Sequence, residues 1–192
     1  MIRAIRMTQS LLLLTLISLT AVTQAQSENA YQIEAILFTQ PSGQISGERT
    51  PDIDWADGAI MLEETARSDV RKLDSTQHRL DREADKLTAQ GYQILMHNAW
   101  IQPTDSRLKV AVHQGERLGD HFPVEAVVGL QRNQDSLALD VKAWRHIAVR
   151  SQTDQDSTLV SEQLHQIRRL RLDEVHYLDH QSMGMLVRVS RR

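Results

Sequence analysis

RRLRLDEVHYLDHQSMGMLV, residues 168–187, contains three arginines, two histidines and a tyrosine and continues into the strand-like run MLVRV. Arginine and leucine alternate at 169–172, which is typical of a strand with one charged face and one apolar face. A turn is expected around residues 179–183, before Gly184. We therefore predict strands at 159–172, 174–178 and 183–190, and a fold dominated by β structure.

The earlier part of the chain adds five predicted strands. Residues 31–38, YQIEAILF, become apolar on both faces, which predicts a strand in the centre of a sheet. Alternating apolar residues predict a hairpin of strands 124–131 and 136–149 around the turn Asn133-Gln134-Asp135. The other two strands are expected at 92–101 and 107–113.

One segment has helical periodicity. Leu80, Ala84 and Leu87 recur at helical spacing. Asp74 is a candidate N-cap, and Gly91 stands where a C′ glycine would end the helix. The pattern predicts an α+β fold: a single domain with an antiparallel sheet of about six to eight strands and one main helix packed on it. A single helix covers only part of one sheet face, so the uncovered surface is a candidate binding surface.

The first 25 residues are typical of a secretory signal peptide. Arg3 and Arg6 precede the apolar run LLLLTLISLTAV at 11–22, and Thr23 and Ala25 supply small residues before a cleavage point. Twelve apolar residues are too few to span a bilayer, which needs about 20. We therefore expect a signal peptide at 1–25, a domain at 26–192, and a periplasmic location.

Composition excludes several classes of function. The chain has no cysteine, which excludes disulfides and thiolate metal sites. Removing Arg3 and Arg6 from 22 basic residues leaves 20 against 25 acidic ones, a net charge near −5 that argues against nucleic acid as a partner. Nucleophile-elbow, phosphate-loop, dinucleotide and zincin motifs do not occur in the sequence. We expect a protein that is not an enzyme and needs no cofactor.

His176, Asp179 and His180 suggest a metal site, to which His97 or His113 could add a ligand. On a strand, however, positions 176 and 180 lie roughly 13 Å apart at about 3.3 Å per residue. Zinc ligands must converge at about 2 Å from the ion. We therefore predict no metal site.

Arg168, Arg169 and Arg171 form the other candidate site. One interpretation is a solvated sheet face neutralised by neighbouring acids, namely Asp173, Glu174 or Glu162. The functional interpretation is a patch that binds carboxylates, because the guanidinium group grips them in pairs. Muramyl peptides carry carboxylates, so peptidoglycan is a chemically sensible ligand for an exported protein. The candidate ligand-binding residues are Arg168, Arg169, Arg171, His176, Tyr177 and Trp100, although burial in the core is the favoured interpretation for Trp100 and Trp144.

Three segments together resemble a known family. They are YQIEAILF at 31–38, YQILMHNAWIQP at 92–103, and RRLRLDEVHYLDH at 168–180 with Gly184 after it. Their order and spacing resemble the CsiV-type periplasmic peptidoglycan-binding proteins of gammaproteobacteria. Two features depart from the pattern: Gln181 stands where proline is expected, and the hairpin at 131–137 lacks an aromatic residue.

The resemblance implies a non-enzymatic factor that binds peptidoglycan and promotes its assembly and cell-shape integrity. It also implies two partners, an outer-membrane lipoprotein activator and the class A penicillin-binding protein that it activates. No catalytic residue is carried over. Two alternatives stay open from the residues alone: a protein–protein adaptor that docks through a sheet face or edge, and a cell-wall hydrolase.

Overall fold

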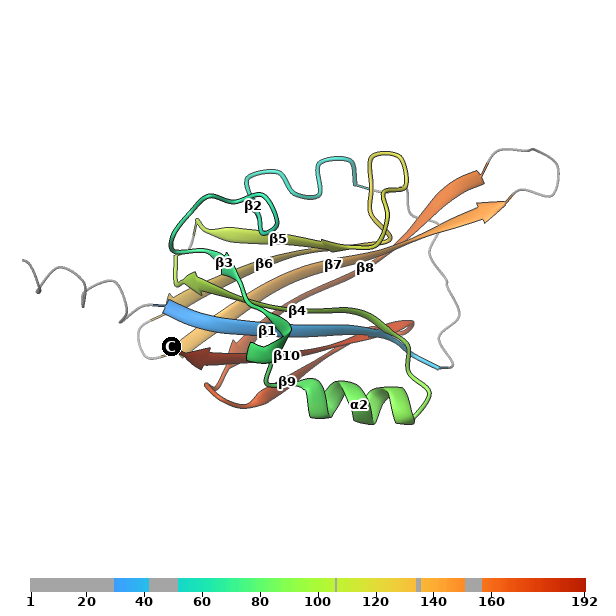
Figure 1. Ribbon diagram of the computed structural model, residues 1–192. Coiled ribbons are helices and arrows are strands. Elements are labelled where there is room, and N and C mark those ends of the chain that lie inside the picture. Colours follow the sequence, from blue (N-terminus) through green and yellow to red (C-terminus); the bar gives the residue numbers. More distant parts are fainter. Residues whose placement is uncertain (1–29, 42–51, 106, 134–135, 151–156) are drawn as a thin grey trace, which may run out of the picture.

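A computed structural model describes residues 30–41, 52–105, 107–133, 136–150 and 157–192. The described residues form two β-sheets that pack face to face, with one short helix on the outside (Figure 1). The signal peptide predicted at 1–25 lies outside the described residues. In the described part of the chain, no helix has the length and apolar character needed to cross a membrane.

The first sheet is fully antiparallel and has the order β3-β4-β1-β10-β9. Its strands are β1 (Ala30–Thr39), β3 (Arg71–Lys72), β4 (Ile94–Pro103), β9 (Val175–Asp179) and β10 (Met183–Arg191). As residues 31–38 predict, β1 is the central strand, and its residues from Tyr31 to Phe38 are all buried. The first and last long strands of the described chain are therefore neighbours in one sheet.

The second sheet has the order β2-β5-β6-β7-β8. Its strands are β2 (Ile60–Met61), β5 (Lys109–Gln114), β6 (Val124–Asn133), β7 (Ser136–Arg150) and β8 (Ser157–Leu170). The predicted hairpin is confirmed: β6 and β7 pair from Val124 with Arg145 to Asn133 with Ser136. The sheet is mixed, because β2 runs parallel to β5.

The main core lies between the two sheets. Alternate residues of each long strand face the other sheet, as period-two patterning requires. These inward rows include Tyr31, Ile33, Ala35 and Leu37 on β1; Val124, Ala126, Val128 and Leu130 on β6; Leu137, Leu139, Val141 and Ala143 on β7; and Met183, Met185, Val187 and Val189 on β10. The prediction of one antiparallel sheet of six to eight strands is therefore wrong in its division of the strands. The described residues contain eight long strands, but these form two sheets together with two strands of two residues each.

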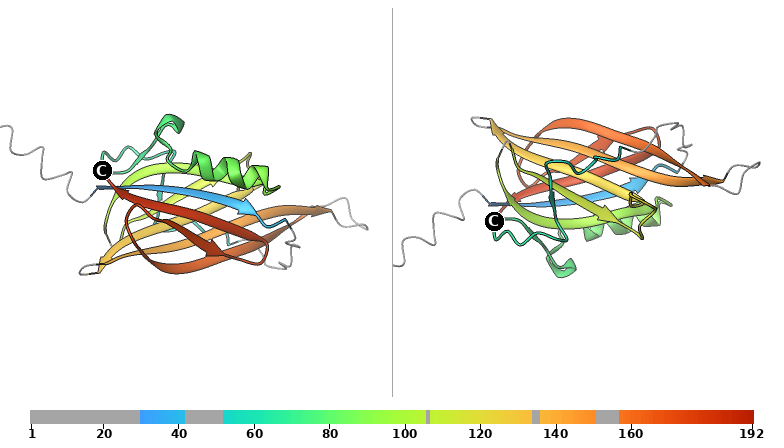
Figure 2. Two further views of the ribbon diagram at one scale, coloured as in Figure 1. Left: turned by 90° about the horizontal axis from the view of Figure 1, so that it is seen from below. Right: turned by 90° about the horizontal axis from the view of Figure 1, so that it is seen from above.

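The outer face of the first sheet is partly covered by the helix α2 (Asp81–Ala89) (Figures 1 and 2). Leu80 is fully buried there with Ile36 and Phe38, while Ala84 and Leu87 pack against them. The helix is shorter than the predicted segment, since Asp74 caps a separate 3-10 turn, η1 (Ser75–Gln77). The two elements are separate because a buried carboxylate, that of Glu34, accepts hydrogen bonds from the backbone N–H groups of Arg79 and Leu80.

The outer face of the second sheet is covered by the segment before β2. Trp55 packs edge to face against Trp144 at a ring-centroid distance of 6.3 Å. Ala111, Val127 and Trp144 form a small cluster under this cover. Trp55 is therefore part of the cover of this face. Both sheets therefore carry a local cover on the face that points away from the main core.

Gly184 lies under two aromatic rings and is expected to resist substitution. A Cβ added at this position would lie 2.6 Å from Phe38 Cζ and 2.8 Å from Tyr177 Cε2. We expect Gly184→Ala to lower the free energy of unfolding by about 1–3 kcal/mol, because the rings must shift. Urea-induced unfolding measures the change.

The matched control is Gly129→Ala, also on a strand, where the nearest atom to the new Cβ is Lys109 Cγ at 3.7 Å. We expect this variant to unfold within about 0.5 kcal/mol of the wild type, because 3.7 Å is an ordinary contact distance. An equal loss of stability in both variants would contradict the steric explanation for Gly184.

Candidate end pocket

A pocket of about 300 Å³ opens between the two sheets at one end of the sandwich. It lies where β1 and β8 meet the ends of β6 and β10. Its lining consists of Tyr31, Arg132, Leu137, Leu170, Arg171, Leu172 and Arg191. We call this site the end pocket. Three of its seven lining residues are arginines, and none of these described lining residues is acidic.

Strand register explains why these side chains meet. In the second sheet, Leu137 pairs with Arg132 on one side and with Leu170 on the other. In the first sheet, Tyr31 pairs with Arg191. These two rows face each other across the end of the main core.

Arg132 and Arg191 extend inward rows that are otherwise apolar. Arg132 follows Val128 and Leu130 in the alternation of β6, and Arg191 follows Val187 and Val189 in that of β10. An arginine at the end of such a row can pack its stem on the core while its guanidinium group reaches water. Both residues are exposed, which agrees with this position at the mouth of the sandwich.

The hydrogen bonds of the end pocket leave most of its positive charge available. Arg132 donates a hydrogen bond to the hydroxyl of the fully buried Tyr31, and its guanidinium carbon lies 5.8 Å from that ring's centroid. Arg171 Nη1 lies 3.7 Å from Glu174 Oε1, but both side chains are largely exposed. Such exposed pairs contribute little energy, so this one competes weakly with a ligand. The end pocket is suited to a carboxylate attached to an apolar or neutral group.

The structure separates the three arginines of the predicted patch. Arg168 and Arg169 are exposed and point to opposite faces of β8, since Arg168 shares the row of the buried Leu170. Arg171 follows the end of β8 and lines the end pocket. Binding by these three residues remains a prediction, but they do not form one surface.

His176 and Tyr177 have defined structural contacts. His176 Nε2 lies 3.1 Å from both the backbone N and the backbone O of Arg171, so this ring holds the turn between β8 and β9. Tyr177 stacks on Phe38, and its hydroxyl donates to Asp179 Oδ1 at 2.6 Å. Partial burial and this hydrogen bond raise the pKa of Tyr177 to about 12. Tyr177 remains 44% exposed and can still meet a ligand.

Trp100 lies in the main core. It has no exposed surface, and its Nε1 donates to Gln102 Oε1 at 2.7 Å. Trp144 is 3% exposed. The favoured interpretation of both tryptophans as core residues is therefore confirmed, and as a ligand contact Trp100 is contradicted by its burial.

The run at 176–180 brings no metal ligands together. Asp179 is bound to Tyr177 as described, and His180 Nδ1 lies 3.1 Å from Ser182 Oγ. The ligand-type clusters found among the described residues lie elsewhere, one around His97 and the other around His146.

Sequence reasoning missed Arg132 and Arg191. A signal was present, because each continues an apolar row by one charged residue. The sequence alone does not show that the two rows end at the same mouth of the sandwich, because Arg132 and Arg191 lie 59 positions apart.

Comparison with curated proteins gives no match. The sequence matches the family model described as "Peptidoglycan-binding protein, CsiV" over residues 9–192, which is nearly the whole chain. That description names binding and not catalysis, and it implies a location in the cell envelope. The chain belongs to the CsiV family of peptidoglycan-binding proteins.

Proposed function

We propose that the protein holds peptidoglycan through the end pocket, where arginines bind carboxylates of the stem peptides. The protein acts as a non-enzymatic periplasmic factor that promotes peptidoglycan assembly and cell-shape integrity. It works with an outer-membrane lipoprotein activator of a class A penicillin-binding protein. The partners and the periplasmic location rest on the family resemblance and on the predicted signal peptide.

The observation that carries this proposal is the composition of the end pocket. Arg132, Arg171 and Arg191 converge there, and no acidic residue is among the described lining. A hydrogen bond between a guanidinium and a carboxylate contributes about 1.5–3 kcal/mol, more than a neutral hydrogen bond. The mature chain is expected to be acidic overall, so this local positive charge selects where a carboxylate binds.

We expect replacement of two pocket arginines to weaken binding to sacculi. Arg171→Ala/Arg191→Ala removes two guanidinium groups from the end pocket and leaves Arg132 with its contact to Tyr31. Loss of one charge-assisted bond of about 1.5–3 kcal/mol corresponds to roughly 10- to 100-fold weaker binding. Sedimentation of the mature protein with purified sacculi, at low and high salt, measures this loss of binding.

The matched control is Arg168→Ala/Arg169→Ala. It removes the same charge from the neighbouring part of β8, but neither residue lines the end pocket. We expect it to bind within about twofold of the wild type, since these two charges lie outside the end pocket and salt screens them from a ligand bound there. Equal losses in both variants would mean that net charge, and not the end pocket, governs binding.

The same assay separates the other candidate functions. A wild-type protein that stays wholly in the supernatant would contradict direct binding and favour the adaptor. Release of soluble muropeptides by the purified protein would contradict the non-enzymatic role and favour the hydrolase.

A further inference from the structure

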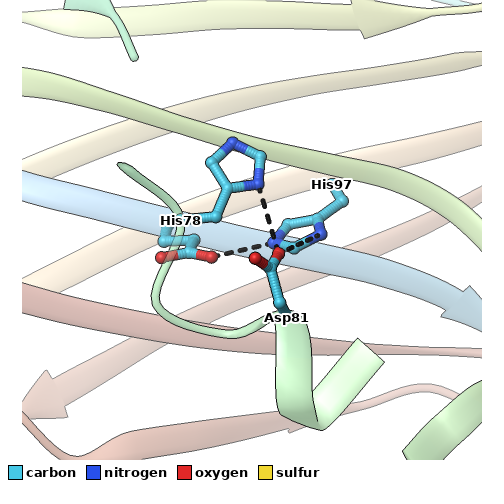
Figure 3. Close-up of side chains that lie close together, drawn as sticks. His78, Asp81 and His97 are labelled. Atoms are coloured by element: carbon cyan, nitrogen blue, oxygen red, sulfur yellow. Dashed lines mark hydrogen bonds and ion pairs between the residues drawn. The ribbon is translucent and has the colours of Figure 1, made fainter. Parts of the chain in front are cut away.

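Two histidines and an aspartate meet at the start of α2, on the outer face of the first sheet. Figure 3 shows His78, Asp81 and His97 pointing toward one another from three places in the chain. His78 lies just before α2, Asp81 is its first residue, and His97 lies on β4 opposite Ile36 of β1. The two imidazole rings lie 4.3 Å apart, centroid to centroid.

The distances in this cluster are longer than hydrogen bonds. Asp81 Oδ1 lies 3.7 Å from His78 Nδ1 and 3.9 Å from His97 Nδ1. Ligands at 2.0–2.1 Å in a tetrahedral zinc site lie about 3.3 Å from one another. Asp81 Oδ1 therefore lies only a few tenths of an ångström beyond this spacing from each nitrogen, and the candidate ligand atoms of the cluster all lie within 4.8 Å of one another.

A buried carboxylate orients one of the histidines. Glu34 is 1% exposed, and its Oε1 lies 2.8 Å from His97 Nε2. Glu34 also accepts hydrogen bonds from the backbone N–H groups of Arg79 and Leu80, so its carboxylate is held in place. In the neutral tautomer that donates Nε2–H to this carboxylate, the lone pair lies on Nδ1, which faces Asp81 at 3.9 Å. Metal-binding histidines are commonly oriented by a carboxylate in this way.

A second His–carboxylate cluster shows the contrast. His121 Nδ1 and His146 Nε2 lie 3.2 and 2.9 Å from the same oxygen, Glu125 Oε2. These are hydrogen-bond distances to a single atom, and the three residues are buried. These two ring nitrogens are therefore already engaged by the carboxylate of Glu125. The cluster at α2 is open by comparison, since the Asp81 side chain is 65% exposed.

We propose that His78, Asp81 and His97 bind one divalent transition-metal ion of the zinc type, with Glu34 holding His97 in the ligating orientation. Two imidazole nitrogens and one carboxylate oxygen are a donor set that suits zinc and leaves a fourth position for water. The ion joins the η1–α2 segment to β4 of the first sheet. The prediction of no metal site came from the run at 176–180, which does not include His78 or Asp81.

The test is titration of the mature, tag-free and chelator-treated protein with ZnCl₂ by calorimetry. We expect one ion per chain and a rise in melting temperature on binding, because the ion binds only the folded site. Co²⁺ used in place of Zn²⁺ should give the visible bands of a four-coordinate ion. Absence of stoichiometric binding by the wild type would overturn the proposal.

His78→Gln/Asp81→Asn should weaken Zn²⁺ binding at least tenfold and remove the rise in melting temperature. The matched control is His165→Gln/Asp140→Asn, which removes another His–carboxylate pair, 3.2 Å apart, from the second sheet. It should bind as the wild type does. Asp81→Asn alone gives a milder variant of an exposed residue and should also bind more weakly. Wild-type binding by the site variants, or equal loss in the control, would overturn the proposal.

Discussion

Glu125→Ala is expected to lower the free energy of unfolding by about 3–5 kcal/mol, the cost of breaking a buried charged network by removing one partner. Glu125 has no exposed surface. Its Oε2 accepts from His121 and His146, and its Oε1 accepts from the backbone N of Phe122 at 2.8 Å. The substitution leaves two buried imidazoles and one partly buried backbone N–H without this acceptor.

Urea-induced unfolding followed by tryptophan fluorescence measures the loss, because Trp144 is the strand partner of Glu125. Glu116→Ala is the control, since Glu116 is an exposed carboxylate in the preceding loop. It should unfold within about 0.5 kcal/mol of the wild type. A loss below about 1 kcal/mol in Glu125→Ala would show that the network contributes little.

A triple replacement tests the cause of the stability loss that is expected in Glu125→Ala. Buried ionic groups often add little net stability over apolar residues of similar size, although breaking them is costly. His121→Leu/Glu125→Leu/His146→Leu is therefore expected to lose less stability than Glu125→Ala. Comparing the two variants shows whether the loss in Glu125→Ala comes from buried donors left without an acceptor or from the lost attraction between the carboxylate and the histidines.

The sequence predicts the strands of this protein better than their arrangement. Period-two patterning identifies the eight long strands, the central place of β1 and the hairpin of β6 and β7. It does not separate two sheets, because alternation tells which residues share a face and not which strands pair. Among the long strands, the chain passes from the first sheet to the second between β4 and β5 and returns between β8 and β9, and the alternation within these strands marks neither change. Two-residue strands such as β2 are too short to show any period.

The candidate sites depend on register, which the sequence does not contain. Arg171 was expected to bind a carboxylate beside Arg168 and Arg169, yet it lies with Arg132 and Arg191 at the sandwich mouth. The proposed metal site also depends on strand register. Spacing relates His78 to Asp81 along the chain, but only the pairing of β1 with β4 brings His97 and Glu34 to them.

Glu34→Ala is expected to lower the free energy of unfolding by about 3 kcal/mol or more, since three hydrogen bonds to a buried carboxylate are lost. The carboxylate oxygens of Glu34 lie 2.7 Å from Arg79 N, 2.8 Å from Leu80 N and 2.8 Å from His97 Nε2. These bonds attach the segment before α2 to the first sheet. Urea unfolding in the presence of a chelator measures the loss without metal, and the exposed Glu64→Gln serves as control.

Glu34→Gln separates the charge from the shape of this carboxylate. Burial raises the pKa of Glu34, but hydrogen bonds from His97 and from the two backbone N–H groups lower it by more, so the pKa lies below the ordinary value of a glutamate. Its stabilisation is therefore complete above the pKa of the unfolded chain and is lost as the pH falls through the folded value. The stability difference between wild type and Glu34→Gln should accordingly shrink from about pH 6 to about pH 3. A difference that stays constant over this range would mean that the charge of Glu34 does not help to hold α2. The hydrogen bonds between this side chain and the backbone would then hold the helix without charge.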